Sequence, residues 1–268
     1  MKLAIVSDEL KIPQREAFQH IDAWGIRHVE LRGLTGGRIP DGDVDEAQRL
    51  AESYGMTITS LSPGVFKCPA QSSAIDEHLI RLDRTLDQCE KLNVRQIIVF
   101  PVQNSEDVDV NDEGDGNPTS LVIDAIREAG KRANQRGIRL AIENEPGYSA
   151  VTARGLARLI DTVGMENIGA NWDPGNAYPW DTEIADAVGI LGDRLFNVHV
   201  KDAWLRDGKR GFDSVGNGDI DWKRQIDQLA RYGYSGHIVV ETHCDPRVSV
   251  DKSKENVATI RRWIEDHK

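Results

Sequence analysis

The sequence predicts a single (β/α)8 barrel, an α/β fold of the TIM-barrel type, over residues 1–268. Short apolar runs alternate with amphipathic stretches eight times along the chain. Several of these runs are almost continuously apolar, as in parallel strands that are covered on both faces. The length of 268 residues also suits eight βα units. An open doubly wound sheet would carry a glycine-rich loop after its first strand, whereas Ser7–Gln14 contains no glycine.

Each predicted strand is a short apolar run bounded by polar or turn-forming residues. The eight expected strands are Leu3–Val6, His28–Leu31, Thr57–Leu61, Gln96–Phe100, Arg139–Ile142, Ile168–Trp172, Leu195–Val200 and Ile238–Val240.

Each predicted helix has apolar residues at helical spacing, and many end in glycine or asparagine, which tolerate a left-handed C-cap. The clear ones span Arg15–Gly25, Asp45–Gly55, Ile75–Asn93, Ser120–Gly137, Ala153–Gly164, Asp221–Gly233 and Ser253–His267. A weaker helix is expected over Asp181–Leu191. The Gly216-Asn-Gly218 run predicts a tight loop before the helix that begins near Asp221.

The composition argues against nucleic acid as a partner. Lys and Arg sum to 33 against 44 for Asp and Glu, so the formal charge is −11, and such a field repels polyanions. Three cysteines without a C-x-x-C pair fit a reducing compartment. The N-terminal apolar run is too short for a signal peptide, and no window resembles a membrane span. We therefore expect a cytoplasmic protein with no membrane partner.

An acidic stretch, Ser105–Asn117, follows the fourth predicted strand. Asp107, Asp109 and Asn111 imitate the start of an EF-hand loop, but Asp112 stands at the required glycine and Pro118 at the closing glutamate. A calcium site is therefore not expected. A solvated loop and a flap over the barrel mouth remain the two interpretations.

Polar side chains gather where the predicted strands end, which is the catalytic face of a (β/α)8 barrel. They are Glu30 and Arg32 on the second strand, Glu143, Asn144 and Glu145 on the fifth, Asp173 and Asn176 on the sixth, His199, Lys201 and Asp202 on the seventh, and Glu241 and His243 on the eighth.

Four of these residues, Glu143, Asp173, His199 and Glu241, point to a metal site. Alternation along each strand places them on one face. If that face is the barrel interior, three carboxylates and one imidazole meet there, and the carboxylates would repel one another strongly. A divalent cation removes this conflict. The oxygen-rich donor set favours Mn²⁺, Mg²⁺ or Co²⁺, with Zn²⁺ as an alternative.

The motifs around these residues resemble those of the xylose-isomerase-like TIM-barrel superfamily of sugar phosphate isomerases and epimerases. They are IENEPG at Glu143, NIGANWDPGN at Asp173, NVHVKD at His199, VGNGDIDW over Val215–Trp222 and GYSGHIVVETH at Glu241 and His243. The resemblance implies one metal ion held by Glu143, Asp173, His199 and Glu241. It also implies that Glu143 and Glu241 move the substrate proton as acid and base, through a metal-stabilised enediolate.

The chain departs from the ketose 3-epimerases of that superfamily near the substrate. Asn176 replaces a usual histidine, Lys201 is the nearest cation to the expected arginine, and ENEPGYSA follows the fifth strand. Lys201 and Asn176 are the main candidates for contacts to substrate oxygens. Glu30, Arg32 and His243 are weaker candidates. A phosphorylated substrate stays open because several further cations are expected near the mouth, namely Arg38, Lys67, Arg206, Lys209 and Arg210.

The leading hypothesis is a metal-dependent isomerase or epimerase of a small carbohydrate or its phosphate. The alternative is a dehydratase of a keto-sugar, keto-inositol or dehydroshikimate-like compound on the same site. A trinuclear-zinc nuclease is not favoured, because the third and fourth strands end without histidine. A non-catalytic binding protein is disfavoured by the full set of four ligands. A homo-oligomer remains open.

Overall fold

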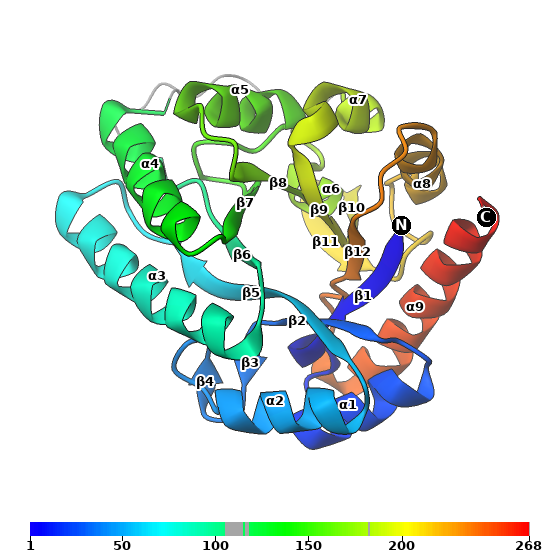
Figure 1. Ribbon diagram of the computed structural model, residues 1–268. Coiled ribbons are helices and arrows are strands. Elements are labelled where there is room, and N and C mark those ends of the chain that lie inside the picture. Colours follow the sequence, from blue (N-terminus) through cyan, green and yellow to red (C-terminus); the bar gives the residue numbers. More distant parts are fainter. Residues whose placement is uncertain (105–114, 116–117, 182, 268) are drawn as a thin grey trace.

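The computed structural model describes residues 1–104, 115, 118–181 and 183–267. Eight parallel strands close into a barrel in the order β1-β12-β9-β8-β7-β6-β5-β2, and helices surround it (Figure 1). The predicted (β/α)8 fold is confirmed, and all eight expected strands are present. Their bounds are β1 Lys2–Val6, β2 His28–Leu31, β5 Thr57–Val65, β6 Gln96–Val99, β7 Arg139–Glu143, β8 Ile168–Trp172, β9 Leu195–Val200 and β12 His237–Val240.

The main helices also lie where the sequence places them, with bounds that differ by a few residues. They are α1 Gln14–Ala23, α2 Val44–Ser53, α3 Ser72–Leu92, α4 Ser120–Gln135, α5 Ala153–Val163, α8 Trp222–Arg231 and α9 Ser249–Glu265. Asn93 and Gly164 take left-handed φ values of 52° and 68° at the ends of α3 and α5, as expected of such C-caps.

The weaker helix is shorter than the sequence predicts. Only Ala187–Leu191 forms α7, between 3-10 turns at Ile184–Asp186 and Gly192–Arg194. A further single-turn helix, α6, covers Pro174–Ala177 directly after β8. It begins at Asp173, whose side chain accepts a hydrogen bond from the backbone N–H of Asn176.

The strand register brings a layer of polar side chains into the upper part of the barrel. Glu143 is paired with Asn171, and Asn171 with Asn197, across β7, β8 and β9. The Asn197 amide donates to Asn171 Oδ1 at 3.0 Å, and the Asn171 amide donates to Glu143 Oε2 at 3.1 Å. All three residues are buried, so the face that they share is the barrel interior, as the alternation predicts.

Two small antiparallel hairpins interrupt the βα alternation, and neither was expected from the sequence pattern. β3 (Gly33–Leu34) pairs with β4 (Gly37–Arg38), and β10 (Asp202–Arg206) pairs with β11 (Lys209–Asp213). The second hairpin turns at Asp207-Gly208, where both residues have positive φ, 51° and 73°. This is the geometry of a type I′ turn, for which Asp-Gly is a favoured pair.

The Gly216-Asn-Gly218 run lies in a loop before α8, as expected, and the buried carboxylate of Asp202 organises it. Asp202 accepts backbone N–H bonds from Gly216 at 2.8 Å, Gly218 at 3.2 Å and Ile220 at 3.3 Å. A Cβ on Gly218 would lie only 2.2 Å from Asp202 Oδ1. The glycine is therefore needed for this close approach.

Most of the acidic stretch after β6 lies outside the described residues, and with it the choice between a solvated loop and a flap. Asp115 is described and buried. Its carboxylate accepts hydrogen bonds from the backbone N–H groups of Val151 and Thr152 at 2.7 and 3.0 Å. In the described part of the chain, no helix combines the length and the apolar character needed to cross a membrane.

His237, at the start of β12, is expected to make stability depend on pH. Burial, followed by the charges of His28 and Lys2, lowers the pKa of His237 to about 4. The unfolded side chain titrates near about 6.5. Between this pH and the folded pKa, the unfolded state therefore binds a proton that the folded state does not bind. The free energy of unfolding should therefore fall as the pH drops from about 6.5 to 4, and less steeply in His237→Gln.

Urea unfolding at several pH values measures this effect. His20→Gln is the matched control, since His20 is exposed on α1. Equal losses of stability in the wild-type protein and in His237→Gln between pH 7 and 5 would contradict the assignment.

Candidate functional site

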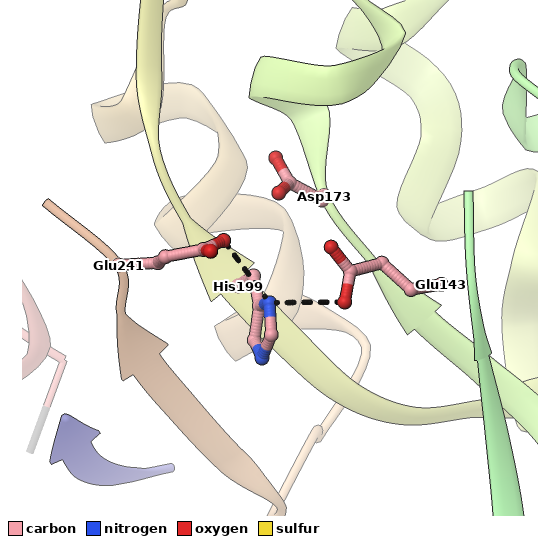
Figure 2. A group of neighbouring side chains, drawn as sticks. All are labelled: Glu143, Asp173, His199 and Glu241. Atoms are coloured by element: carbon pink, nitrogen blue, oxygen red, sulfur yellow. Dashed lines mark ion pairs between the residues drawn. The ribbon is translucent and has the colours of Figure 1, made fainter. Parts of the chain in front are cut away.

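Four side chains converge at the carboxyl ends of four neighbouring strands. Glu143 ends β7, Asp173 follows β8, His199 lies in β9 and Glu241 follows β12. All four are buried, with exposed fractions of 4 % or less. Each offers a ligand atom, and these atoms lie within 4.8 Å of one another. Figure 2 shows the carboxylates of Glu143 and Glu241 on either side of the His199 ring.

His199 directs its Nδ1 toward the two flanking carboxylates. Its Nε2 lies 3.1 Å from Glu30 Oε1. Its Nδ1 lies 3.4 Å from Glu143 Oε2 and 3.3 Å from Glu241 Oε2, and it is buried without a hydrogen-bond partner. In the neutral imidazole, a hydrogen bond from Nε2–H to Glu30 leaves the Nδ1 lone pair directed at the position between the carboxylates, as in metal-binding histidines. The donor set thus fits a divalent cation.

The cluster contains more negative charge than a buried site tolerates without a cation, and the pKa values of its members are shifted as a result. Burial, reinforced by Glu241 and Glu143 and opposed by Lys201, raises the pKa of Asp173 to about 7. Burial alone would lower the pKa of His199, but Glu30 and Glu143 outweigh it and raise that pKa well above the usual value. A bound divalent cation would take the place of these protons.

Glu30 does not line the cavity, contrary to the expectation of a substrate contact. Its carboxylate is fully buried beneath His199 and accepts a hydrogen bond from Ser60 Oγ at 2.7 Å. We assign it to orienting His199. Glu30→Gln should therefore weaken metal binding by about 10–100-fold. A competition titration with a metal indicator measures this, with Glu16→Gln on the exposed face of α1 as the control. Unchanged affinity in Glu30→Gln would contradict the role.

Asn176 lies at the cavity, as expected of a residue near the substrate, but most of its hydrogen-bonding groups are already used. Its amide Nδ2 donates to Glu143 Oε1 at 3.1 Å and to Asn144 O at 2.9 Å. Both amide hydrogens are therefore used within the protein, and Asn176 positions Glu143. Only its Oδ1 is left for a substrate hydroxyl.

Lys201 is buried at the floor of the cavity between two carboxylates. Its Nζ lies 2.7 Å from Asp173 Oδ2 and 3.0 Å from Glu241 Oε2. Burial would lower its pKa, but Asp173, Glu241 and Glu143 outweigh burial and raise it, so the side chain is an ammonium ion. Since an ammonium has three N–H donors, one remains beyond these two contacts. Lys201 thus remains a candidate for contact with a substrate oxygen.

A second set of ligand atoms, from Glu9, Glu241 and His243, also lies within 4.8 Å. The guanidinium of Arg32 already spans it. Arg32 NH1 donates to Glu241 Oε1 at 2.6 Å, NH2 contacts Glu9, and Nε lies 3.1 Å from Asp8 Oδ1. A positive side chain therefore stands where a second cation would bind, and the geometry favours a single metal ion. Arg32 borders the cavity, as does His243, whose ring meets that of Phe212 edge-on.

A cavity of about 550 Å³ lies at the barrel mouth, and Glu143, His199, Lys201 and Glu241 are among the residues that line it. Of the further cations expected there, Arg38, Lys67 and Arg210 line it. Arg206 is exposed and pairs instead with Asp219 at 2.6 Å, and Lys209 is exposed on the β10–β11 hairpin.

Two features of this site were not predicted from the sequence. Asp8 and Glu9, which follow β1 and fix Arg32, were not recognised as part of the site. Arg210 and Phe212 enter the wall because the β10–β11 hairpin carries them there. The Asp207-Gly208 pair between alternating residues is the signal that would have revealed this hairpin.

Buried carboxylates and an imidazole at this end of the strands are typical of barrel enzymes that act through a bound metal ion. A family model described as xylose isomerase-like TIM barrel matches residues 18–267. The chain therefore belongs to the xylose isomerase-like TIM barrel family, as its motifs predict.

Curated relatives match parts of the chain. An inosose dehydratase of Salmonella agona is 30% identical over 142 residues, which cover 47% of this chain and 47% of the relative. The alignment thus spans about half the length of that relative. Further relatives have the same name, and one of them, from Geobacillus thermodenitrificans, is 24% identical over 84% of this chain and 83% of its own length.

Two solved structures share the whole fold. One, described as an IOLI protein with a bound zinc atom, has a TM-score of 0.81 and 16% identity, and the match covers 100% of this chain and 99% of the other. The other, an L-ribulose 3-epimerase, has a TM-score of 0.78 and 17% identity, with coverage of 100% and 96%. At these identities the likeness concerns the fold.

Proposed function

We propose that this protein is a divalent-metal-dependent isomerase or epimerase of a small carbohydrate, with Glu143 and Glu241 as acid and base. The observation that carries the proposal is the placement of these two carboxylates. They flank His199 Nδ1 at 3.4 and 3.3 Å and reach the cavity from different strands (Figure 2). A substrate bound between them presents one face to each carboxylate.

Glu143, Asp173, His199 and Glu241 would hold the metal. When bound, such an ion polarises a carbonyl and its neighbouring hydroxyl and so acidifies the C–H between them. Mn²⁺, Mg²⁺, Co²⁺ and Zn²⁺ all fit the donor set. Asp173 has no assigned proton transfer, because its carboxylate is fully buried against Lys201.

The two proposed acid–base residues are held by different groups. Glu143 accepts hydrogen bonds from two neutral amides, those of Asn171 and Asn176. Glu241 accepts from two cations, Arg32 and Lys201. One carboxylate removes the proton next to the carbonyl. The other returns a proton to the opposite face for epimerisation, or the proton returns to the neighbouring carbon for isomerisation.

The test is deuterium exchange. Metal-loaded protein is incubated in D₂O with ketoses, aldoses, keto-inositols and sugar phosphates, and the substrates are followed by NMR. We expect deuterium at a carbon next to the carbonyl, together with conversion to an isomer of the same mass. If every substrate stays protonated while metal analysis shows the ion bound, the proton-transfer proposal is wrong.

A dehydratase is the second candidate, since curated relatives carry that name and Lys201 is a charged acid next to Glu241. The Lys201 ammonium, 3.0 Å from Glu241, is in position to protonate a departing hydroxyl so that water leaves. In that case the product loses water and absorbs in the ultraviolet. Lys201→Met would then stop elimination while deuterium exchange continues.

A further inference from the structure

The cavity wall holds six cations, and most of them are neutralised by nearby carboxylates. Lys11 lies 3.4 Å from Glu9, and Lys67 lies 3.0 Å from Glu145. Arg32 contacts Asp8, Glu9 and Glu241, and Lys201 contacts Asp173 and Glu241. The remaining two are Arg38 and Arg210. Within residues 1–104, 115, 118–181 and 183–267, no carboxylate oxygen lies within 4 Å of either guanidinium.

Both guanidinium groups are half-buried and are fixed by neutral acceptors. Arg38 Nε donates to Ser62 O at 2.8 Å, and NH2 donates to Ser62 Oγ at 3.1 Å. Arg210 Nε donates to Tyr178 O at 2.7 Å, and NH2 donates to Gly175 O. Since a guanidinium has five N–H donors, three remain on each. A half-buried cation with free donors and no counter-ion is costly unless a ligand supplies the charge.

The proposed metal site does not supply that charge. Glu143, Asp173 and Glu241 carry three negative charges, which Lys201 and a divalent cation would balance. Arg32 is matched by Asp8 and Glu9. Glu30 adds one further buried negative charge beneath His199. Among the described residues, the loaded cavity therefore keeps one net positive charge, which lies with Arg38 and Arg210. A neutral sugar would leave it uncompensated, whereas an anionic substrate would not.

Arg38 is better placed than Arg210 to hold the anion. Its guanidinium packs against Gly64, where a Cβ would lie 3.3 Å from Arg38 Cζ. Its NH2 group also donates a hydrogen bond to the Ser62 hydroxyl at the cavity wall. Arg32 and Arg81 add positive potential near Arg38, which Asp8 and Glu143 offset in part, whereas near Arg210 the charges of Asp173 and Glu145 only reduce it. Arg210 is also engaged through its face with the rings of Trp180 and Phe212.

We infer that the substrate carries a carboxylate or phosphate group, which the free N–H donors of Arg38 bind while Arg210 strengthens the attraction from another part of the mouth. This inference rests on the proposed function, because it places the keto end of the same substrate at the metal site. The ligand class is thus an anionic polyhydroxy ketone. Ionic hydrogen bonds of this kind correspond to a preference of about 10–100-fold over the neutral compound.

Calorimetric titration of the metal-loaded protein tests the inference with three ketohexose probes: fructose, fructose 6-phosphate and 5-ketogluconate. We expect at least one anion to bind about 10–100-fold more tightly than fructose. A preference for the phosphate or for the carboxylate identifies the source of the charge. Arg38→Met should abolish the preference, Arg38→Lys should retain part of it, and Arg210→Met should reduce it less.

The control is Arg206→Met, because Arg206 lies on the same hairpin as Arg210 but pairs with Asp219 outside the cavity. It should bind all three probes like the wild-type protein. Circular dichroism establishes that each variant is folded. Equal binding of neutral and anionic probes overturns the inference, and so does absence of anion binding at tens of millimolar. A preference that survives Arg38→Met overturns the role of Arg38.

The titration involves no turnover, so the two proposals fail separately. Anion preference without deuterium exchange would contradict only the proposed reaction. Deuterium exchange into a neutral sugar, with no preference for anions, would contradict only the inference about Arg38.

Discussion

Replacing Glu143 or Glu241 by glutamine should lower the rate of substrate inversion by about 10²–10⁴-fold. Glutamine has nearly the same shape as glutamate but cannot accept the proton. If the two carboxylates act on opposite faces of the substrate, one variant cannot remove the proton and the other cannot return one. Both variants therefore lose inversion. Residual deuterium exchange without inversion would then report the surviving base. NMR of the substrate in D₂O separates the two processes, because it measures both deuterium content and configuration.

Metal content must be measured in the same samples, since both residues are also proposed ligands. Glu16→Gln, on exposed α1, is the control and should have wild-type rates. Inversion at the wild-type rate in either Glu143→Gln or Glu241→Gln, with metal bound, would exclude that residue as an acid or base. Loss of metal together with activity would instead assign the residue to binding the ion.

Removing the Asp202 carboxylate should lower the free energy of unfolding by about 2–4 kcal/mol. The side chain is fully buried and accepts three backbone hydrogen bonds from the loop before α8. In Asp202→Ala these N–H groups lose their acceptor, and the loop loses its connection to the end of β9. Asp202→Asn retains an acceptor oxygen but turns a donor toward part of the loop, so its loss should be smaller.

Urea unfolding followed by circular dichroism gives the two values. Asp124→Ala is the control, because that side chain is 73% exposed on α4 and its removal should change stability little. A loss below about 1 kcal/mol in Asp202→Ala would show that water replaces the carboxylate in the loop.

The barrel could be predicted because its pattern repeats. Eight buried strands require eight apolar runs, and runs such as Gln96–Val99 and Ile168–Trp172 are buried throughout in the structure. The region around α7 was less clear because its helix is only one turn long, between two 3-10 turns. The β10–β11 hairpin was missed because it departs from the repeat, although its Asp-Gly turn is a local signal.

For the candidate site, alternation along the strands correctly indicated that Glu143, Asp173, His199 and Glu241 meet. What each neighbouring residue touches could not be predicted in the same way. Glu30 and His199 come from strands that are far apart in the sequence, so their 3.1 Å contact depends on closure of the barrel. The amide of Asn176 is directed to Glu143 by the turn of α6, and this orientation follows from the backbone rather than from the motif.

The way in which the barrel closes also has a consequence for synthesis. β1 pairs with β12, so that Leu3 lies beside Ile238, and β12 is the last of the eight barrel strands in chain order. Until it emerges, β1 has one unpaired edge and Glu241 is absent from the group around His199. A nascent chain that still lacks β12 therefore cannot assemble the complete ligand set, and the proposed metal site can form only after β12 has been synthesised.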